Sequence, residues 1–150
     1  MFELLVPATS QQMERVGGDQ AAYDVKVRPD LMLRAIVDLQ DAGIEPDVWK
    51  IEGLDHREDC ERVVSTARRG GRHDVGCIVL GRGADEHKVV RWLTVAASVA
   101  GFIGFAVGRT TFWDAVADFV GKRATRSQAV ARIAQRYHEW AAIFAREEES

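Results

Sequence analysis

Four short apolar runs alternate with segments of helical spacing, and this alternation limits the possible folds more than any other feature of the chain. The last two runs are almost wholly apolar, as expected for strands buried on both faces of a sheet. Strands that alternate with helices predict a parallel sheet with right-handed crossovers. The sequence therefore predicts an α/β protein of four βα units. The runs are Phe2 to Pro7, Asp47 to Ile51, Val75 to Leu80 and Phe102 to Val107.

Helices are expected between the runs, where apolar residues recur every three or four positions. Pro29 suits the start of the first helix, and Gly43 suits its C-terminal cap. Asp55 is a candidate cap for the second helix. The remaining helices are expected from Asp85 to Ala100, from near Trp113 to Val120, and from Thr125 onward.

One long segment has no clear helical or strand pattern. The residues from Ser10 to Arg28 are polar and contain Gly17 and Gly18. We expect a long loop there, and loops of this length are usually functional or disordered.

The chain has 150 residues, which suits one domain spanning residues 1–150. Its formal net charge of -3 argues against a dedicated nucleic-acid-binding protein, which would carry a basic face. Cys60 and Cys77 have no disulfide or zinc-site spacing and fit a reducing cytoplasm. The N-terminus has no signal-peptide pattern. Trp92 to Gly108 is uncharged but short and rich in glycine, so a helix end followed by a buried strand is favoured over a membrane span.

Lys50 is the strongest single indication of chemistry. It lies in the run DVWKIEG, in a strand that is otherwise apolar. Burial of an ammonium is unfavourable, so a desolvated lysine has a depressed pKa, and its free amine attacks carbonyl carbons. Schiff-base chemistry requires such an amine. An edge-strand lysine that extends to solvent is the structural alternative.

Two glutamates lie in similar apolar surroundings. Glu3, in FELLVP, is a candidate general acid or base, although it is also compatible with a frayed terminal strand. Glu52 follows Lys50 by two residues, which places both side chains on one face of a strand. A structural ion pair between Lys50 and Glu52 is therefore also expected.

Two predicted strands end in the same Gly-Arg dipeptide. Gly81 and Arg82 follow the third run, and Gly108 and Arg109 follow the fourth. Glycine lets backbone N–H groups approach a phosphate, and arginine binds phosphate through two N–H groups. Ligands of parallel α/β folds bind at the carboxyl ends of strands, so the two ends predict an anion site. Ordinary turn glycines and surface ion pairs are the alternative.

The remaining histidines and tryptophans carry no recognisable site. The histidines have no metal-ligand spacing and are expected at the surface, whereas the tryptophans are expected to pack in apolar faces. They are His56, His73, His87 and His138, with Trp49, Trp92, Trp113 and Trp140.

Three stretches of the chain together resemble a known family. RPDLMLRAIVDLQDAGIEPDVWKIEGLD, VGCIVLGRG and GFIGFAVGRTTFWDAV are similar to the 2-deoxy-5-keto-D-gluconate 6-phosphate aldolase-like domain of myo-inositol catabolism, a class I aldolase. The resemblance extends from Phe2 to about Phe144. It implies the C-terminal half of a (β/α)8 TIM barrel, without counterparts of the family's first four strands.

The resemblance assigns roles to the candidate residues. It implies a Schiff-base lysine at Lys50, a proton-transfer glutamate at Glu3, and phosphate binding by Gly81 with Arg82 and by Gly108 with Arg109. It implies no metal and no cofactor. The expected reaction is cleavage of a phosphorylated keto sugar acid to dihydroxyacetone phosphate and malonate semialdehyde, a carbon–carbon lyase step in carbohydrate metabolism.

The expected partners follow from the same resemblance. They are the phosphorylated sugar substrate and either a second copy of the chain or a complementary half-barrel chain, with neither nucleic acid nor membrane. A non-catalytic phosphosugar-binding or assembly module is the alternative function. An open sheet with its edges covered is the alternative to a dimer of half-barrels.

Overall fold

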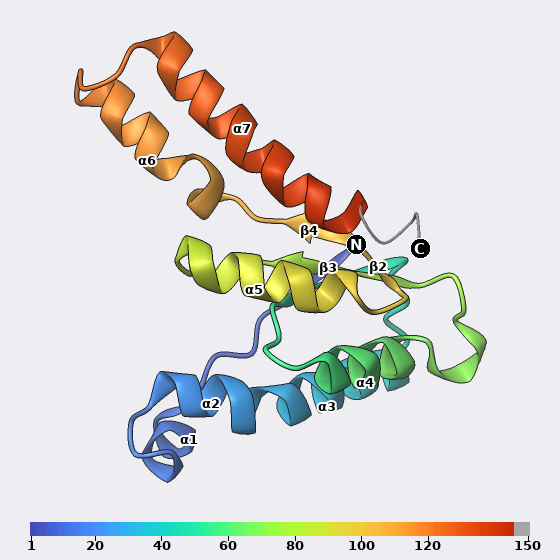
Figure 1. Ribbon diagram of the computed structural model, residues 1–150. Helices are drawn as coiled ribbons and strands as arrows, with labels where there is room; N and C mark the ends of the chain where they lie inside the picture. The colour runs from blue at the N-terminus through green and yellow to red at the C-terminus, as the bar shows by residue number, and fades with distance from the viewer. Residues whose placement is uncertain (146–150) are drawn as a thin grey trace.

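A computed structural model describes residues 1–145, and in this part of the chain four parallel strands form one sheet (Figure 1). The strands lie side by side in chain order, and each neighbouring pair is parallel. The prediction of an α/β fold with four βα units is thereby confirmed. The strands begin or end one to three residues away from the apolar runs; they are β1 (Phe2–Leu4), β2 (Val48–Glu52), β3 (Gly76–Leu80) and β4 (Phe102–Ala106).

Seven α-helices accompany the sheet in the described residues. The first two lie between β1 and α3, and α6 and α7 follow β4 as a helical hairpin that projects from the sheet (Figure 1). A short 3-10 turn, Arg69–Gly71, follows α4. The helices are α1 (Ser10–Arg15), α2 (Gln20–Lys26), α3 (Arg28–Asp41), α4 (Arg57–Ala67), α5 (Glu86–Ala97), α6 (Arg109–Val120) and α7 (Arg126–Ala145).

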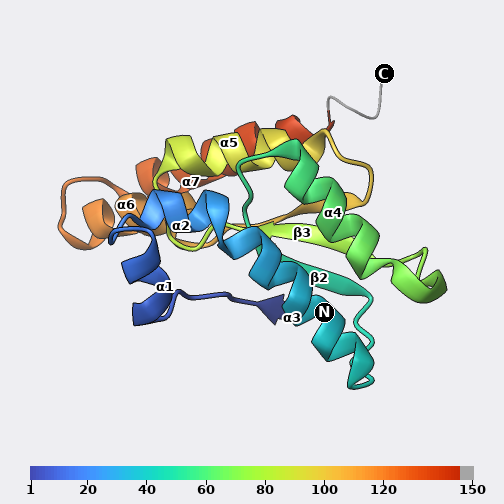
Figure 2. The ribbon, with the colours of Figure 1, turned by 90° about the horizontal axis from the view of Figure 1, so that it is seen from below.

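The core lies between one face of the sheet and helices α3, α4, α5 and α7. Trp49 and Ile51 of β2 point into it and are fully buried. Seen from below, α3, α4 and α5 lie across this face (Figure 2). Because the strand order never reverses, crossovers of one hand keep the helices on the same face, unlike the two covered faces of a doubly wound sheet. Residues from the helices in this core include Met32, Ile36, Val63, Leu93 and Trp140.

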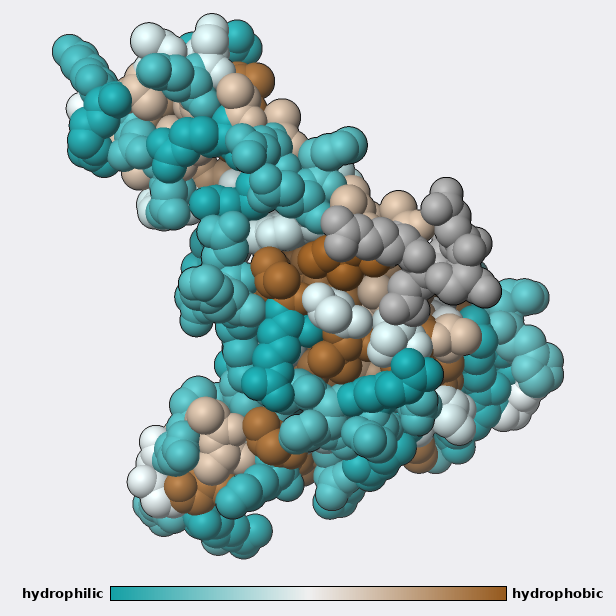
Figure 3. Space-filling view, in the orientation of Figure 1, coloured by the Kyte–Doolittle hydropathy of each residue, from teal (hydrophilic) through white to brown (hydrophobic). Residues whose placement is uncertain are grey.

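The opposite face of the sheet, which we call the open face, is exposed mainly at its two edges, and Ile78 in its centre is only 8% exposed. Glu3, Lys50, Ile78 and Gly104 form one row across it, in register from β1 to β4. Ile103 is 63% exposed, and Leu5, just after β1, is 53% exposed. On the side of the molecule where α5 lies, Figure 3 shows apolar surface between the α6–α7 hairpin above and the α1–α2 helices below.

The predicted loop from Ser10 to Arg28 is wrong, because α1 and α2 occupy most of it. Thr9 caps α1 in a capping box with Gln12, and the Asp19 side chain accepts hydrogen bonds from the first N–H groups of α2. Gly17 adopts a positive φ of 66° in the turn between the helices. Local capping therefore makes two short helices from a polar segment.

Two smaller expectations also change. Asp55 does not cap α4, whose N-cap is His56; its carboxylate binds Lys88 of α5 instead. Trp49, Trp92 and Trp140 are buried as expected, but Trp113 on α6 is 60% exposed. The histidines His56, His73, His87 and His138 are all exposed, as predicted.

Within residues 1–145, no helix has the length and apolar character that crossing a bilayer requires. The segment from Trp92 to Gly108 instead holds the end of α5, a turn and strand β4.

Candidate functional site

Lys50 and Glu3 meet on the open face of the sheet. They are directly opposite each other in the parallel register of β1 and β2, and the Lys50 Nζ lies 2.7 Å from the Glu3 Oε2. The Lys50 side chain is 20% exposed and that of Glu3 is 49% exposed. The two predicted catalytic residues are therefore brought together as an ion pair. The alternative pair of Lys50 with Glu52 does not form.

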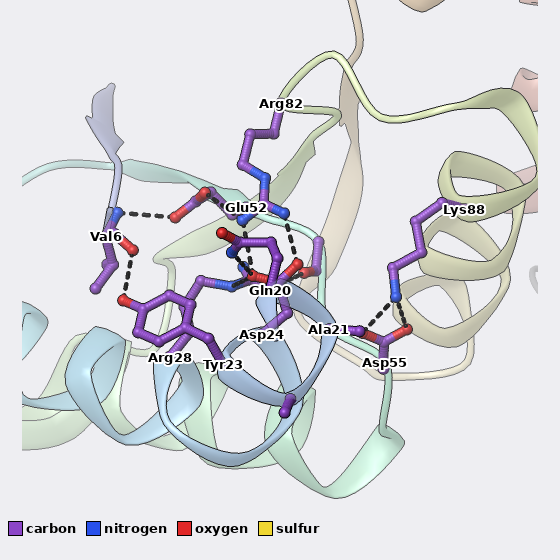
Figure 4. Close-up of polar contacts among 12 residues, drawn as sticks. Val6, Gln20, Ala21, Tyr23, Asp24, Arg28, Glu52, Asp55, Arg82 and Lys88 are labelled. Atoms are coloured by element: carbon purple, nitrogen blue, oxygen red, sulfur yellow. Dashed lines mark hydrogen bonds and ion pairs between the residues drawn. The ribbon is translucent and has the colours of Figure 1, made fainter. Parts of the chain in front are cut away.

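Glu52 belongs to a second polar cluster at the carboxyl end of the strands (Figure 4). Its buried carboxylate accepts a hydrogen bond from the Val6 N–H at 2.8 Å and lies 3.3 Å from Arg82 Nη1. Arg82 Nη2 in turn donates to Asp24 Oδ2 at 2.5 Å. Strand β2, the residues after β3 and helix α2 are thus joined by charge-assisted hydrogen bonds.

Arg28, at the start of α3, lies beneath this cluster and is fully buried. Its Nη2 donates to the Gly53 carbonyl at 2.8 Å, and its Nε lies 3.3 Å from Asp24 Oδ1. Arg28 and Arg82 each lie 5.9 Å from the centre of the Trp92 ring. The two guanidinium groups balance the charges of Asp24 and Glu52, so the cluster is formally neutral.

The pKa shifts in the cluster follow from burial and from these contacts. Burial alone would raise the pKa of Asp24, but hydrogen bonds from Arg82 and Gln20 outweigh it and hold this pKa below its ordinary value. Burial lowers the pKa of Arg28, whereas the hydrogen bond to Asp24 raises the pKa of Arg82. Burial also raises the pKa of Tyr23, whose hydroxyl donates to the Val6 carbonyl at 2.8 Å.

A pocket of about 570 Å³ opens beside the cluster, at the carboxyl ends of β1, β2 and β3. Parallel α/β proteins bind ligands at this end of the sheet. Helices α1 and α2, which replace the expected loop, supply one wall. The pocket is lined by Leu5, Pro7, Ala8, Met13, Gln20, Tyr23, Glu52 and Arg82.

The two Gly-Arg strand ends differ in their surroundings. Arg82 has a positive φ of 50° and is ion-paired with Asp24 and Glu52, so it is already engaged within the protein. Arg109 starts α6 and has no hydrogen bond or ion pair from its side chain to another described residue. The two arginines therefore do not form the symmetric pair that their sequences suggested.

Arg109 instead lines a separate pocket of about 620 Å³ at the ends of β3 and β4. Gly83 has a positive φ of 73°, and a Cβ atom built there would lie 3.1 Å from an Arg109 guanidinium nitrogen. Gly108 is the N-cap of α6, which has no side-chain cap. Arg136 and three acidic residues also line this pocket: Asp85, Glu86 and Asp114. Gly81 packs against Val107, which brings the ends of β3 and β4 together.

The two cysteines are not candidate nucleophiles. Both are buried in the core, and burial raises the pKa of each thiol to about 12. A thiol with such a pKa is protonated near neutral pH, so it is not reactive. Of the strand residues, Lys50 is the one whose nucleophilic side chain lies outside the core.

Sequence reasoning missed Asp24 and Arg28. Both belong to the segment that was predicted as a loop, where charged residues are expected to be solvated. An available indication was Asp19, which is a favoured N-cap residue and is followed by Tyr23 and Val27 at helical spacing. A helix there would have placed Asp24 and Arg28 on one face, four residues apart.

Comparison with known proteins places the chain in a family without naming an activity. No curated protein and no solved structure shows significant similarity to it. Residues 16–148, most of the chain, match one family of bacterial sequences. The chain therefore belongs to DUF2090, the family described as an uncharacterized protein conserved in bacteria.

Proposed function

We propose that this chain is a class I aldolase-like carbon–carbon lyase that acts on a phosphorylated keto sugar acid. The observation that carries the proposal is the contact between Lys50 Nζ and Glu3 Oε2, 2.7 Å apart on the open face of a parallel sheet. The resemblance to aldolase domains assigns the Schiff base and the proton transfer to these same two residues. The chain order of the strands and the helices on one face also agree with a half-barrel of the TIM type.

The reaction that follows is metal-independent. The Lys50 amine, after losing a proton, attacks the keto carbon and forms a carbinolamine. Loss of water, with Glu3 supplying and removing protons, yields the iminium ion. When the carbon–carbon bond breaks, its electron pair moves into the iminium to form an enamine, the hydroxyl on the departing carbon loses its proton, and that carbon leaves as the aldehyde. Protonation and hydrolysis then release dihydroxyacetone phosphate and restore the lysine.

The cellular setting belongs to the same proposal. Dihydroxyacetone phosphate and malonate semialdehyde are the products that the resemblance implies, in cytoplasmic myo-inositol catabolism. Two buried free thiols suit a reducing compartment.

A non-catalytic phosphosugar-binding or assembly module is the second candidate. The exposure of the ion pair favours it, because Glu3 is 49% exposed. Imine chemistry benefits from a desolvated amine, which a solvated ion pair does not provide. This alternative predicts that phosphosugars bind without forming a covalent adduct.

Borohydride trapping separates the two candidates. We expect incubation with dihydroxyacetone phosphate and borohydride to give a reduced adduct on Lys50, detected by mass spectrometry of the digested protein. Lys88 is an internal control in the same digest, since its Nζ also lies 2.7 Å from a carboxylate, that of Asp55. Glu3→Gln should slow adduct formation by about a hundredfold or more, because general acid–base catalysis contributes at least that much.

Each outcome decides between the candidates. An adduct on Lys50 that disappears in Lys50→Met supports the lyase. Modification of Lys88 to the same extent, or adducts that persist in Lys50→Met, would reject Lys50 as the nucleophile. Binding without any adduct would favour the non-catalytic module.

A further inference from the structure

The two edges of the sheet are unpaired within the described residues. The outer edge of β1 and the outer edge of β4 have no neighbouring strand there. Exposed apolar strand edges favour pairing with another chain. Neither edge strand contains a proline, and β4 contains no charged residue. These edges point to a partner that adds parallel strands at both ends.

An exposed apolar stripe on α7 borders the β4 edge. Val130 is 51% exposed and Tyr137 is 56% exposed, and Ala134, between them on the helix, is also exposed. The Tyr137 ring lies 5.5 Å from the ring of Phe105 in β4, which places this stripe beside the edge strand. Spacings of four and three residues put the three side chains on one face of α7. We call these residues the α7 stripe.

A groove lies at the opposite edge of the sheet, beside β1 and α3. It has a volume of about 370 Å³, and Leu31 and Ala35 of α3 contribute part of its wall. Arg34 and Asp38 also line it, from the same helix. The remaining lining comes from the segment that follows β1, including Leu5, Val6 and Pro7. We call this the α3 groove.

The chain itself shows how such ends fit together. Neighbouring strands pair in parallel, and the helices that follow them pack side by side: α3 on α4, α4 on α5, and α5 on α7. Continuing the series past β4 would place another first strand beside β4 and another α3 beside α7. A second copy of the chain supplies both elements in the required order.

We propose that two copies of this chain dimerise end to end, with the α7 stripe of each copy in the α3 groove of the other. A twofold axis along the strands keeps all strands parallel and pairs β4 with the partner's β1 twice. Eight strands result, the number in a closed βα barrel. The open faces then enclose one central cavity. Each Lys50–Glu3 pair is formally neutral, which makes its enclosure less costly than that of an isolated charge.

This assembly goes beyond the proposed lyase activity and does not depend on it. The twofold axis repeats one contact: the stripe of each copy meets the groove of the other, and neither contact joins identical surfaces. A charge placed in either surface should therefore disrupt the dimer, and opposite charges placed in the two surfaces of different chains should restore it. Loss of imine chemistry would leave this inference unaffected.

The test uses sedimentation velocity at micromolar concentration. We expect the wild-type chain to sediment with twice the 16.7 kDa mass of the monomer. Ala134→Glu in the stripe and Ala35→Lys in the groove should each weaken dimerisation by about a hundredfold, because each buries an unpaired charge. Ala131→Glu is the matched control, since Ala131 is also exposed on α7 but lies off the stripe.

Mixing the two variants gives the decisive measurement. A mixed dimer has one wild-type contact and one contact in which the introduced carboxylate faces the introduced ammonium, so mixing should restore the dimer. If the wild-type chain still sediments as a monomer when its concentration is raised, the inference is overturned. The same holds if a different chain covers the two edges. A dimer that survives both single substitutions, or one that Ala131→Glu disrupts equally, would also overturn it. Circular dichroism and the melting temperature of each variant show that folding is retained.

Discussion

Asp24 shows how a single residue connects distant parts of this molecule. Its carboxylate contacts Arg82, which follows β3, and Arg28, at the start of α3, while its own helix α2 is short. Removing one member of a buried charge network leaves the others unpaired, which typically costs about 3–5 kcal/mol. Asp24 is therefore expected to matter more for stability than its place in a polar segment suggests.

The depressed pKa of Asp24 predicts a pH dependence of stability. In the unfolded chain the carboxyl group titrates near its ordinary value of about 3.9, and in the folded protein it titrates lower. Its contribution to the free energy of unfolding is fully present above the unfolded pKa and is lost as the pH falls through the folded pKa. We expect the stability difference between wild type and Asp24→Asn, measured by urea unfolding, to shrink as the pH falls below about 4.

Asp74→Asn provides the control for this measurement. Asp74 lies in the exposed turn before β3, and its side chain has no ion pair to another described residue. Its substitution should leave the free energy of unfolding within about 0.5 kcal/mol of wild type at each pH. An Asp24→Asn variant whose deficit stays constant down to about pH 2 would contradict the assignment.

Arg109 is the arginine that we expect to bind a phosphate. Its side chain makes no ion pair with other described residues and lines a pocket at the ends of β3 and β4. A charge-assisted hydrogen bond contributes about 1.5–3 kcal/mol, so Arg109→Ala should weaken binding of dihydroxyacetone phosphate by about tenfold or more. Isothermal titration calorimetry measures this change. Arg123→Ala, near the other end of α6, should bind as wild type does; unchanged affinity in Arg109→Ala would argue against the phosphate site.

At the scale of the elements, α1 and α2 depend on their caps more than on the core. Helix α1 has no buried residue, and α2 buries only Tyr23 and Asp24. Few apolar contacts mean that such a segment opens at low free-energy cost. These two helices form a wall of the pocket beside Glu52, so their opening would expose that pocket.

The cap of α2 offers a direct test of this local stability. The Asp19 side chain accepts hydrogen bonds from the Ala21 and Ala22 N–H groups at 2.8 and 3.2 Å. Loss of an N-cap costs about 1 kcal/mol, so Asp19→Ala should speed hydrogen exchange in residues 20–26 by about fivefold. Exchange in β2 and β3 should not change. Asp19→Asn retains a capping side chain, and equal acceleration in both variants would show that the cap is not the cause.

At the scale of the whole molecule, the order of the strands decides what the sheet can do. A sheet with strands in chain order and helices on one face has a covered face, an open face and two unlike ends. Its open face holds the Lys50–Glu3 pair, and its two ends carry the α7 stripe and the α3 groove. The proposed chemistry and the proposed assembly therefore use different surfaces, and each is tested separately.

Local periodicity was enough to predict the four βα units and most helix positions, because these features depend on residues that are close together in the chain. It did not reveal α1 and α2, whose stability comes from side-chain caps in a polar segment. Three outcomes required the folded chain: Lys50 pairs with Glu3 and not with Glu52, Arg82 is engaged by Asp24, and Trp113 is exposed. Those outcomes depend on strand register and on the packing of residues far apart in the chain, and nothing in local sequence specifies them.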